Sequence, residues 1–309
     1  MRPAVFPGRR PTPQASQQLS GRVILVTGVT AGIGRAIVRR LSAAGAIVIG
    51  CARDEQRLAA VRTELPPVDV RRADVRSDAD RAALVGYVLD RYGRIDALVN
   101  NAGVGHVGLV EDIRADQVER IYQTNVVGLV DLTRRVLPHL LARGDGDVVM
   151  VSSASSWLAT PPLTVYCSSK FAVHGFVEGL RREVGPRGVR ISSVNPGPVA
   201  TEWLARCLDH QPAEGEPGLR LSPGVDADRV AAAVQRALTS GRGTTIAVPR
   251  FYGLGRLLSV QPFKLTTDTL LGVAARRAAA IGDRMARART PGVPAESTGT
   301  VPPERRDSG

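Results

Sequence analysis

The chain is poor in lysine and in aromatic residues. Its only lysines are Lys170 and Lys264, so 39 of its 41 basic residues are arginines. The formal net charge is +12, but the arginines are scattered and aromatic residues make up only 4% of the chain. Bases would therefore find few aromatic platforms on which to stack, and we expect no nucleic-acid binding.

Cysteine and histidine are also too sparse to form a recognisable metal or disulfide pattern. Cys51, Cys167 and Cys207 are far apart, and the four histidines show no ligand spacing. No apolar run reaches the roughly 18 residues of a membrane span. The first twenty residues also lack the apolar run of a signal peptide. These absences predict a cytoplasmic protein without a metal site.

The remaining composition predicts one α/β domain with extended ends. Hydrophobic residues make up 43% of the chain, enough for a large core. Strand-like and helix-like patterns alternate over residues 21–250. We expect a disordered tail at 1–20, a helical C-terminal extension at 251–289 and a second disordered tail at 290–309.

A glycine-rich turn follows the first apolar run. Residues 22–27 have the nearly continuous apolar pattern of a buried parallel strand, and 35–44 have an amphipathic helical pattern. Gly28, Gly32 and Gly34 permit a tight turn that brings a pyrophosphate close to a helix N-terminus. A turn that simply needs glycine is the alternative, but the flanking strand and helix favour a nucleotide site.

The end of the second predicted strand, 46–52, bears on which nicotinamide cofactor is bound. A carboxylate at this position binds the ribose 2′-OH of NAD, whereas an arginine binds the 2′-phosphate of NADP. The sequence has Ala52 at the acidic position and Arg53 after it. We predict NADP(H) in preference to NAD(H), the alternative being an arginine that only ends a strand at the surface.

Tyr166, Lys170 and Ser153 have the chemistry of a carbonyl site. In a helix, residues four apart share a face, so the phenol and the ammonium would point into the same space. A nearby cation would lower the phenol pKa from about 10 towards neutrality. Ser153 follows a predicted strand, 147–152, at the edge where open α/β sheets bind ligands. A surface helix with a solvated lysine is the alternative.

Two further segments contain polar or rigid features. A buried Asn must be hydrogen-bonded, so Asn125, within a predicted helical segment at 117–143, either stabilises a kink or belongs to a water and proton path. Two prolines around Gly197 predict a rigid turn that closes over the carboxamide end of the cofactor. The segment 202–225 is typical of a mobile substrate lid.

Taken in chain order, these motifs resemble the short-chain dehydrogenase/reductase family over about residues 21–250. They are Thr27-Gly28-x-x-x-Gly32-Ile33-Gly34, Asn100-Asn101-Ala102-Gly103, Ser153, Tyr166-x-x-x-Lys170 and Pro196-Gly197. The resemblance implies a single Rossmann domain, a doubly wound α/β fold around a seven-stranded parallel sheet. It also implies hydride transfer between a nicotinamide cofactor and a carbonyl or secondary alcohol.

The resemblance implies a role for each site residue. Tyr166 transfers the proton, and Lys170 lowers its pKa and holds the nicotinamide ribose. Ser153 orients the substrate oxygen, while Asn125 supports a water-linked relay. The implied cofactor contacts are Gly28, Thr30, Gly32, Ile33, Gly34, Arg53, Asp74, Val75, Asn101, Ala102, Gly103, Tyr166, Lys170, Pro196, Gly197, Val199 and Thr201. From the residues alone, Asp74 is equally compatible with a place beside the start of the next helix.

The main hypothesis is an NADP(H)-dependent oxidoreductase for a lipophilic small molecule. The apolar residues expected near its pocket are Trp157, Leu158, Leu163, Trp203 and Leu204. A non-catalytic NADP-binding sensor or interaction protein stays open, as does an epimerase or dehydratase with the same site. The apolar and basic pattern of 251–289 suits subunit packing, a cap on the pocket or peripheral membrane contact. We expect a homo-oligomer.

Overall fold

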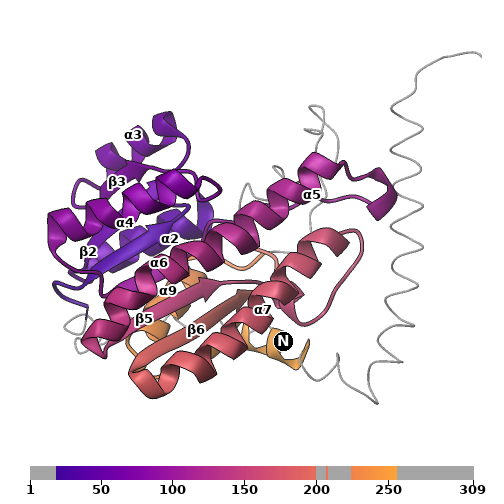
Figure 1. Ribbon diagram of the computed structural model, residues 1–309. Helices are drawn as coiled ribbons and strands as arrows, with labels where there is room; N and C mark the ends of the chain where they lie inside the picture. Colours follow the sequence, from indigo (N-terminus) through magenta and orange to yellow (C-terminus); the bar gives the residue numbers. More distant parts are fainter. Residues whose placement is uncertain (1–18, 200–206, 208–223, 256–309) are drawn as a thin grey trace, which may run out of the picture.

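A computed structural model describes residues 19–199, 207 and 224–255 of the chain. In this part of the chain, seven parallel strands form one sheet in the order β3-β2-β1-β4-β5-β6-β7 (Figure 1). The strands are β1 (Val23–Thr27), β2 (Ile47–Ala52), β3 (Asp69–Arg72), β4 (Ala97–Asn100), β5 (Gly146–Val151), β6 (Val189–Pro196) and β7 (Thr245–Val248).

The strand order reverses direction once. The chain runs outward from β1 to β3 and then returns to place β4 on the other side of β1. This is the doubly wound Rossmann arrangement, so the fold predicted from the sequence is confirmed. In such sheets a crevice opens at the carboxyl ends of the strands where the order reverses, which here is beside β1 and β4.

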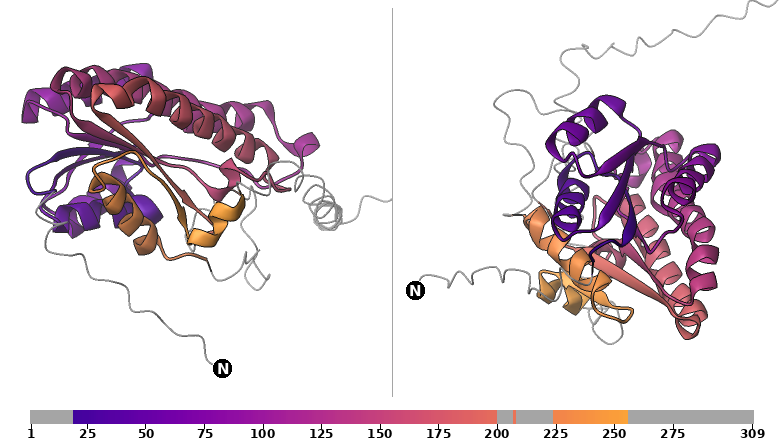
Figure 2. Two further views of the ribbon diagram at one scale, coloured as in Figure 1. Left: turned by 90° about the horizontal axis from the view of Figure 1, so that it is seen from below. Right: turned by 90° about the vertical axis from the view of Figure 1, so that its left-hand side faces the viewer.

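Helices cover both faces of the sheet (Figure 2). Side chains of α2, α3 and α9 pack on one face, and those of α4, α6 and α7 pack on the other. The helices are α2 (Gly32–Ala43), α3 (Glu55–Glu64), α4 (Asp78–Tyr92), α5 (Ala115–Tyr122), η2 (Gln123–Val127), α6 (Gly128–Arg143), α7 (Thr164–Val184) and α9 (Ala227–Leu238), with short turns η1 (Val110–Asp112), η3 (Ala154–Ser156), η4 (Gly185–Arg187) and η5 (Arg250–Leu254).

The first strand shows why an unbroken apolar run is needed. All five residues of β1 are buried, because the strand lies inside the sheet between two helical layers. Ile24 and Val26 pack into the layer of α2 and α9, while Val23 and Leu25 pack into the opposite layer. Alternating side chains thus supply both cores at once.

The predicted helical segment 117–143 is not one continuous α-helix. The α-helix α5 ends at Tyr122, η2 forms a π-helical turn, and α6 begins at Gly128. A Cβ on Gly128 would lie 2.4 Å from the carbonyl oxygen of Val75, so the chain passes very close to the loop after β3. Such π turns occur frequently at functional sites.

One predicted boundary also differs. Leu19 falls in the segment expected to be a disordered tail, yet its side chain is fully buried in the core between the sheet and α2. Residues 1–18 of that tail, the predicted tail at 290–309, and the helical extension beyond residue 255 lie outside the described residues. Most of the predicted lid, 202–225, lies outside them too. None of the helices that are described is both long and apolar enough to cross a membrane.

Candidate active site

A cleft of about 1860 Å³ runs along the carboxyl edge of the sheet. Of the described site residues that the sequence predicted, all except Asn125 line this cleft. Most come from segments that follow the ends of six different strands, which the parallel topology brings to one edge, whereas Tyr166 and Lys170 come from α7. Thr201 lies outside the described residues.

The turn after β1 forms a cradle made of backbone. Gly28 has a φ of +73°, which favours glycine, and a Cβ on Gly34 would lie 1.9 Å from the carbonyl oxygen of Gly28. The amide of Asn101 holds this shape by donating hydrogen bonds to the carbonyl oxygens of Thr27 and Gly28, at 2.9 and 3.0 Å. In turn, the Thr27 hydroxyl accepts hydrogen bonds from the backbone of the Asn101 loop.

The start of α2, inside this cradle, suits an anion. Its N-cap residue is Ala31, which provides no side-chain cap, and the first turn has no acidic residue. Unpaired N–H groups and the helix dipole therefore face the cleft, as a phosphate group requires. The residues present fit the pyrophosphate of a dinucleotide.

Beyond the cradle, the ends of β2 and β3 supply charged groups. Arg53 is exposed in the cleft and forms no ion pair with a described residue. Asp54 caps α3 by accepting a hydrogen bond from the backbone N–H of Arg57 at 3.0 Å. It also pairs with the Arg57 guanidinium at 3.4 Å. The carboxylate of Asp54 is thus occupied beside the unpaired Arg53.

Hydrogen bonds bear on whether Asp74 faces the cofactor site or belongs to the start of the next helix. Ser77, not Asp74, caps α4, because the Ser77 hydroxyl accepts from the backbone of Asp80 at 3.2 Å. Asp74 lines the cleft and accepts hydrogen bonds from Arg76, which lower the pKa of its carboxyl group against the opposing effect of burial. A smaller lowering comes from the positive charge of Arg53.

Tyr166 and Lys170 lie one turn apart on α7, as predicted, and share the cleft with Ser153. The Tyr166 and Lys170 residues are only 8% and 4% exposed. The Lys170 Nζ lies 5.6 Å from the centre of the Tyr166 ring. Ser153 follows β5 and hydrogen-bonds to the Tyr166 side chain. The three residues therefore form one buried group.

Burial controls the protonation of this pair. It raises the pKa of the Tyr166 phenol, against the hydrogen bond with Ser153, which acts in the opposite direction. Burial also lowers the pKa of Lys170 to about 8. The lowered phenol pKa that the sequence suggested is therefore not found in the chain by itself, because removing both groups from water disfavours their charged forms.

Asn125 holds three segments together beneath the cleft. It is fully buried, its Oδ1 accepts from the N–H of Val104 at 2.9 Å, and its Nδ2 donates to the carbonyl of Val104 at 2.8 Å. The same Nδ2 donates to Ser169 at 3.0 Å, and the Ser169 hydroxyl donates to the carbonyl oxygen of Tyr166. These contacts match the kink-stabilising alternative for Asn125, and its part in a proton path stays a prediction.

At the far end of the cleft, the turn after β6 is held on two sides. The N–H of Gly197 donates to the carbonyl of Val248 at 2.9 Å, and the N–H of Val225 donates to that of Pro198 at 2.7 Å. A Cβ on Gly197 would lie 2.4 Å from the ring of Tyr252. The turn η5 is thus packed directly on this end of the cleft.

The apolar lining differs in part from the prediction. Leu158 and Leu163 line the cleft as expected. Trp157 is absent from its lining and packs edge-on against His174, with ring centroids 6.4 Å apart. Trp203 and Leu204 lie outside the described residues.

Sequence reasoning missed several cleft residues. Arg120 on α5 and Cys207 line the cleft. So do three residues of η5, which are Phe251, Tyr252 and Leu254. The η5 residues follow the last strand, where the sequence shows no motif. Arg120 had one usable signal, its place one helical turn before Thr124 in the pattern that surrounds Asn125.

A glycine cradle at a helix N-terminus, joined by one cleft to a buried Ser, Tyr and Lys, defines an NAD(P)-dependent oxidoreductase. The comparison with known families agrees: the short chain dehydrogenase model matches residues 22–212, and the chain belongs to this family.

Similar proteins support the same assignment. The NADPH-dependent pterin aldehyde reductase of Arabidopsis thaliana is 31% identical over 198 residues, which are 63% of this chain and 81% of that protein. A short-chain dehydrogenase structure from Streptomyces avermitilis has a TM-score of 0.69 at 31% identity and covers 82% of this chain and 98% of its own. A 3-ketoacyl-(acyl-carrier-protein) reductase structure from Brucella melitensis, complexed with NADH, has a TM-score of 0.67 at 27% identity. The match covers 74% of this chain and 97% of that chain.

Proposed function

We propose that the protein is an NADP(H)-dependent reductase of a lipophilic carbonyl compound, or the corresponding secondary-alcohol dehydrogenase. The observation that carries this proposal is the burial of Ser153, Tyr166 and Lys170 at the same cleft as the glycine cradle. When bound, the nicotinamide cofactor supplies or accepts the hydride. The protein supplies orientation and the proton.

The protonation states favour the reducing direction. Because its pKa is raised, the Tyr166 phenol keeps its proton at neutral pH and is ready to donate it to a carbonyl oxygen. Its hydrogen bond with Ser153 places two hydroxyl groups together, both able to bind that oxygen. Lys170 is protonated below about pH 8, where its charge stabilises the phenolate left after transfer.

Arg53 supports NADP(H) as the cofactor. The relatives include an NADPH-dependent enzyme and a structure with NADH, so family membership alone leaves the choice open. Arg53, after the end of β2, has no ion-pair partner among the described residues, while the neighbouring Asp54 caps the start of α3. An unpaired guanidinium at this position suits the 2′-phosphate.

A lipophilic substrate is supported by the wall that η5 contributes. Phe251 and Leu254 line the cleft and remain 61% and 59% exposed, an unusual state for large apolar side chains beside a pocket. Leu158 and Leu163 line the cleft from the loop that follows Ser153. An apolar substrate body would cover these side chains.

Assembly with further copies of the chain is part of the proposal. Phe171 on α7 and Val127 on the neighbouring turn η2 are exposed large apolar residues. Burying such residues against another subunit would stabilise an oligomer. Sedimentation of the wild-type chain and of Phe171→Glu would test this assembly.

A panel of ketones and aldehydes, assayed with NADPH and NADH, tests the proposed reaction. We expect loss of NADPH absorbance equal to the alcohol formed. Tyr166→Phe should lower kcat/KM by roughly 10²- to 10⁴-fold, with NADPH affinity nearly unchanged. Full activity in Tyr166→Phe would refute the mechanism.

The same assay separates the alternatives that the sequence left open. A non-catalytic sensor would bind NADPH and turn over no carbonyl. An epimerase or dehydratase would convert its substrate with no net change in NADPH absorbance.

A further inference from the structure

Arg120 is a cation in the cleft that no part of the proposed reaction uses. It is half-buried on α5, lines the cleft, and forms no ion pair or hydrogen bond with any residue that the structure describes. By contrast, Arg114 pairs with Asp116, and Arg134 pairs with Asp131. A partly buried guanidinium without a partner is suited to bind an anion.

The position of Arg120 along the helix shows which end of the cleft it faces. Arg120 lies four residues, about one turn, before Thr124, and the π turn η2 leads on to Gly128. Thr124 lines the cleft, and Gly128 packs against the carbonyl of Val75, which follows β3. Arg120 therefore lies on the cleft side of a helical segment that continues to the loop after β3, at the nucleotide end of the cleft.

The opposite side of the same helix faces the catalytic helix. The Tyr122 hydroxyl hydrogen-bonds to Ser168 of α7 at 2.9 Å. Because Arg120 and Tyr122 are two residues apart, they point to different sides of α5. Arg120 therefore does not share the side of α5 that packs on α7.

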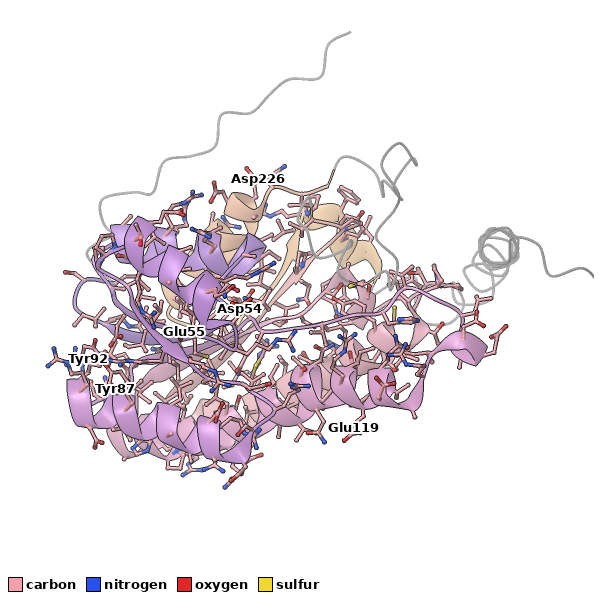
Figure 3. All side chains as sticks on the ribbon, turned by 90° about the horizontal axis from the view of Figure 1, so that it is seen from above. Asp54, Glu55, Tyr87, Tyr92, Glu119 and Asp226 are labelled. Carbon is pink, nitrogen blue, oxygen red and sulfur yellow. The ribbon has the colours of Figure 1, made fainter. Side chains whose placement is uncertain are left out.

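The glycine cradle lies in the other helical layer. α5 packs against α7, and Figure 3 shows Glu119 of α5 in the layer opposite the one that carries Asp54. The glycine cradle and the start of α2 belong to the Asp54 side. An anion in the cradle would therefore have the α2 N-terminus on one side and Arg120 on the other.

We propose that Arg120 binds the pyrophosphate of the dinucleotide from the wall opposite the glycine cradle. The inference rests on the proposed NADP(H)-dependent function and adds a second phosphate-binding residue to Arg53. Each arginine binds a different phosphate group: Arg53 at the end of β2 binds the 2′-phosphate, and Arg120 binds the diphosphate next to β1. A guanidinium presents paired N–H donors that match two phosphate oxygens.

Fragment binding to the protein without carbonyl substrate tests this division. ADP contains the diphosphate and no 2′-phosphate, whereas 2′-AMP has the reverse. Arg120→Gln should weaken ADP and NADPH binding by roughly three- to tenfold and leave 2′-AMP affinity unchanged. Arg53→Gln should do the opposite, weakening 2′-AMP and sparing ADP.

Two matched variants control for charge and folding. Arg134→Gln removes the same charge from an ion-paired, exposed side chain outside the cleft, and should leave all three affinities unchanged. Arg120→Lys keeps the charge without the fork of donors and should bind ADP with intermediate affinity. Thermal unfolding of each variant confirms that the fold is retained.

Unchanged ADP affinity in folded Arg120→Gln would overturn the proposal. So would a loss seen only as a higher KM for carbonyl substrates that contain an acidic group, which would make Arg120 a substrate contact. Because binding is measured without turnover, a failure of the proposed reductase activity remains distinguishable from a failure of this inference.

Discussion

The Lys170 ammonium group lies in a site from which water is largely excluded. The neighbouring Tyr166 phenol is buried in the same site. Burial disfavours the charged form of both groups, so Tyr166 keeps its proton at neutral pH and Lys170 loses its proton above about pH 8. The Tyr166 phenol therefore keeps its proton until a substrate oxygen is present to accept it. Under the proposed function, the Tyr166 phenol is the proton donor for reduction.

The lowered pKa of Lys170 predicts how stability depends on pH. Below about pH 8 the folded chain must keep a buried charge, whereas the unfolded chain holds its lysine proton up to its ordinary pKa of 10.5. Between these values the unfolded state binds more protons, so the free energy of unfolding rises with pH, by on the order of 2–3 kcal/mol.

Urea denaturation of the unliganded protein from pH 7 to 10 measures this rise. The variant Lys170→Met, which removes the titrating group, should lack it. Over the same range the wild-type reduction rate should fall, because the ammonium that stabilises the phenolate is lost. A parallel pH dependence in wild type and variant would contradict the prediction.

Arg53 predicts a change of cofactor preference. Arg53→Gln removes the unpaired guanidinium at the end of β2 and should lower kcat/KM with NADPH by roughly tenfold. The value with NADH should change little, because NADH has no 2′-phosphate. Steady-state kinetics with both cofactors measure the ratio, and an equal loss with both would indicate a general role in folding or binding.

Among the elements, the turn between β1 and α2 depends most strongly on its backbone. Gly34 faces the Gly28 carbonyl so closely that any side chain there must displace the loop. The amide of Asn101 is held against the same loop, so the displacement would extend to the segment after β4.

We expect Gly34→Ala to abolish NADPH binding, measured by fluorescence titration. The matched control is Gly86→Ala in the middle of α4, where a new Cβ meets no atom within 4 Å. That change should raise stability by about 0.5–1 kcal/mol, because alanine favours the helix. If both variants bound NADPH equally well, the cradle would not hold the nucleotide.

On the scale of the whole molecule, the two edges of the sheet differ in the side chains they carry. The carboxyl edge carries the cleft. The amino edge carries a buried network of charges: Asp147 on β5 pairs with Arg22 at 2.5 Å and with Arg190 of β6 at 2.8 Å. Asp96, which precedes β4, pairs with Arg94 and Arg143.

This network predicts a large stability effect far from the active site. Asp147→Ala removes the carboxylate that Arg22 and Arg190 share, and should cost about 1.5–3 kcal/mol because Arg190 keeps its pair with Asp145. Asp228→Ala, which breaks the exposed pair with Arg39, should cost less than about 1 kcal/mol. Urea denaturation measures both, and kcat/KM of the folded Asp147 variant should be retained.

The sequence by itself determined the fold class and most of the site. Strand runs, glycine spacing and the Tyr-x-x-x-Lys pair are local patterns, and in a parallel sheet every strand delivers its last residues to one edge. That is why residues as far apart as Gly28 and Tyr166 were assigned to one cleft before their positions were known. The π turn could not be predicted from a local sequence pattern, because it lies where Gly128 packs closely against Val75, a residue distant in the sequence.

Tertiary structure alone decided the electrostatics and the walls of the cleft. The sequence placed Lys170 beside Tyr166 and suggested a lowered phenol pKa, but the depth of burial reversed the direction. Arg120 and the residues of η5 belong to no motif and enter the site only through packing. Local patterns follow from the backbone period, whereas solvation and unpaired charge depend on everything that folds around a group.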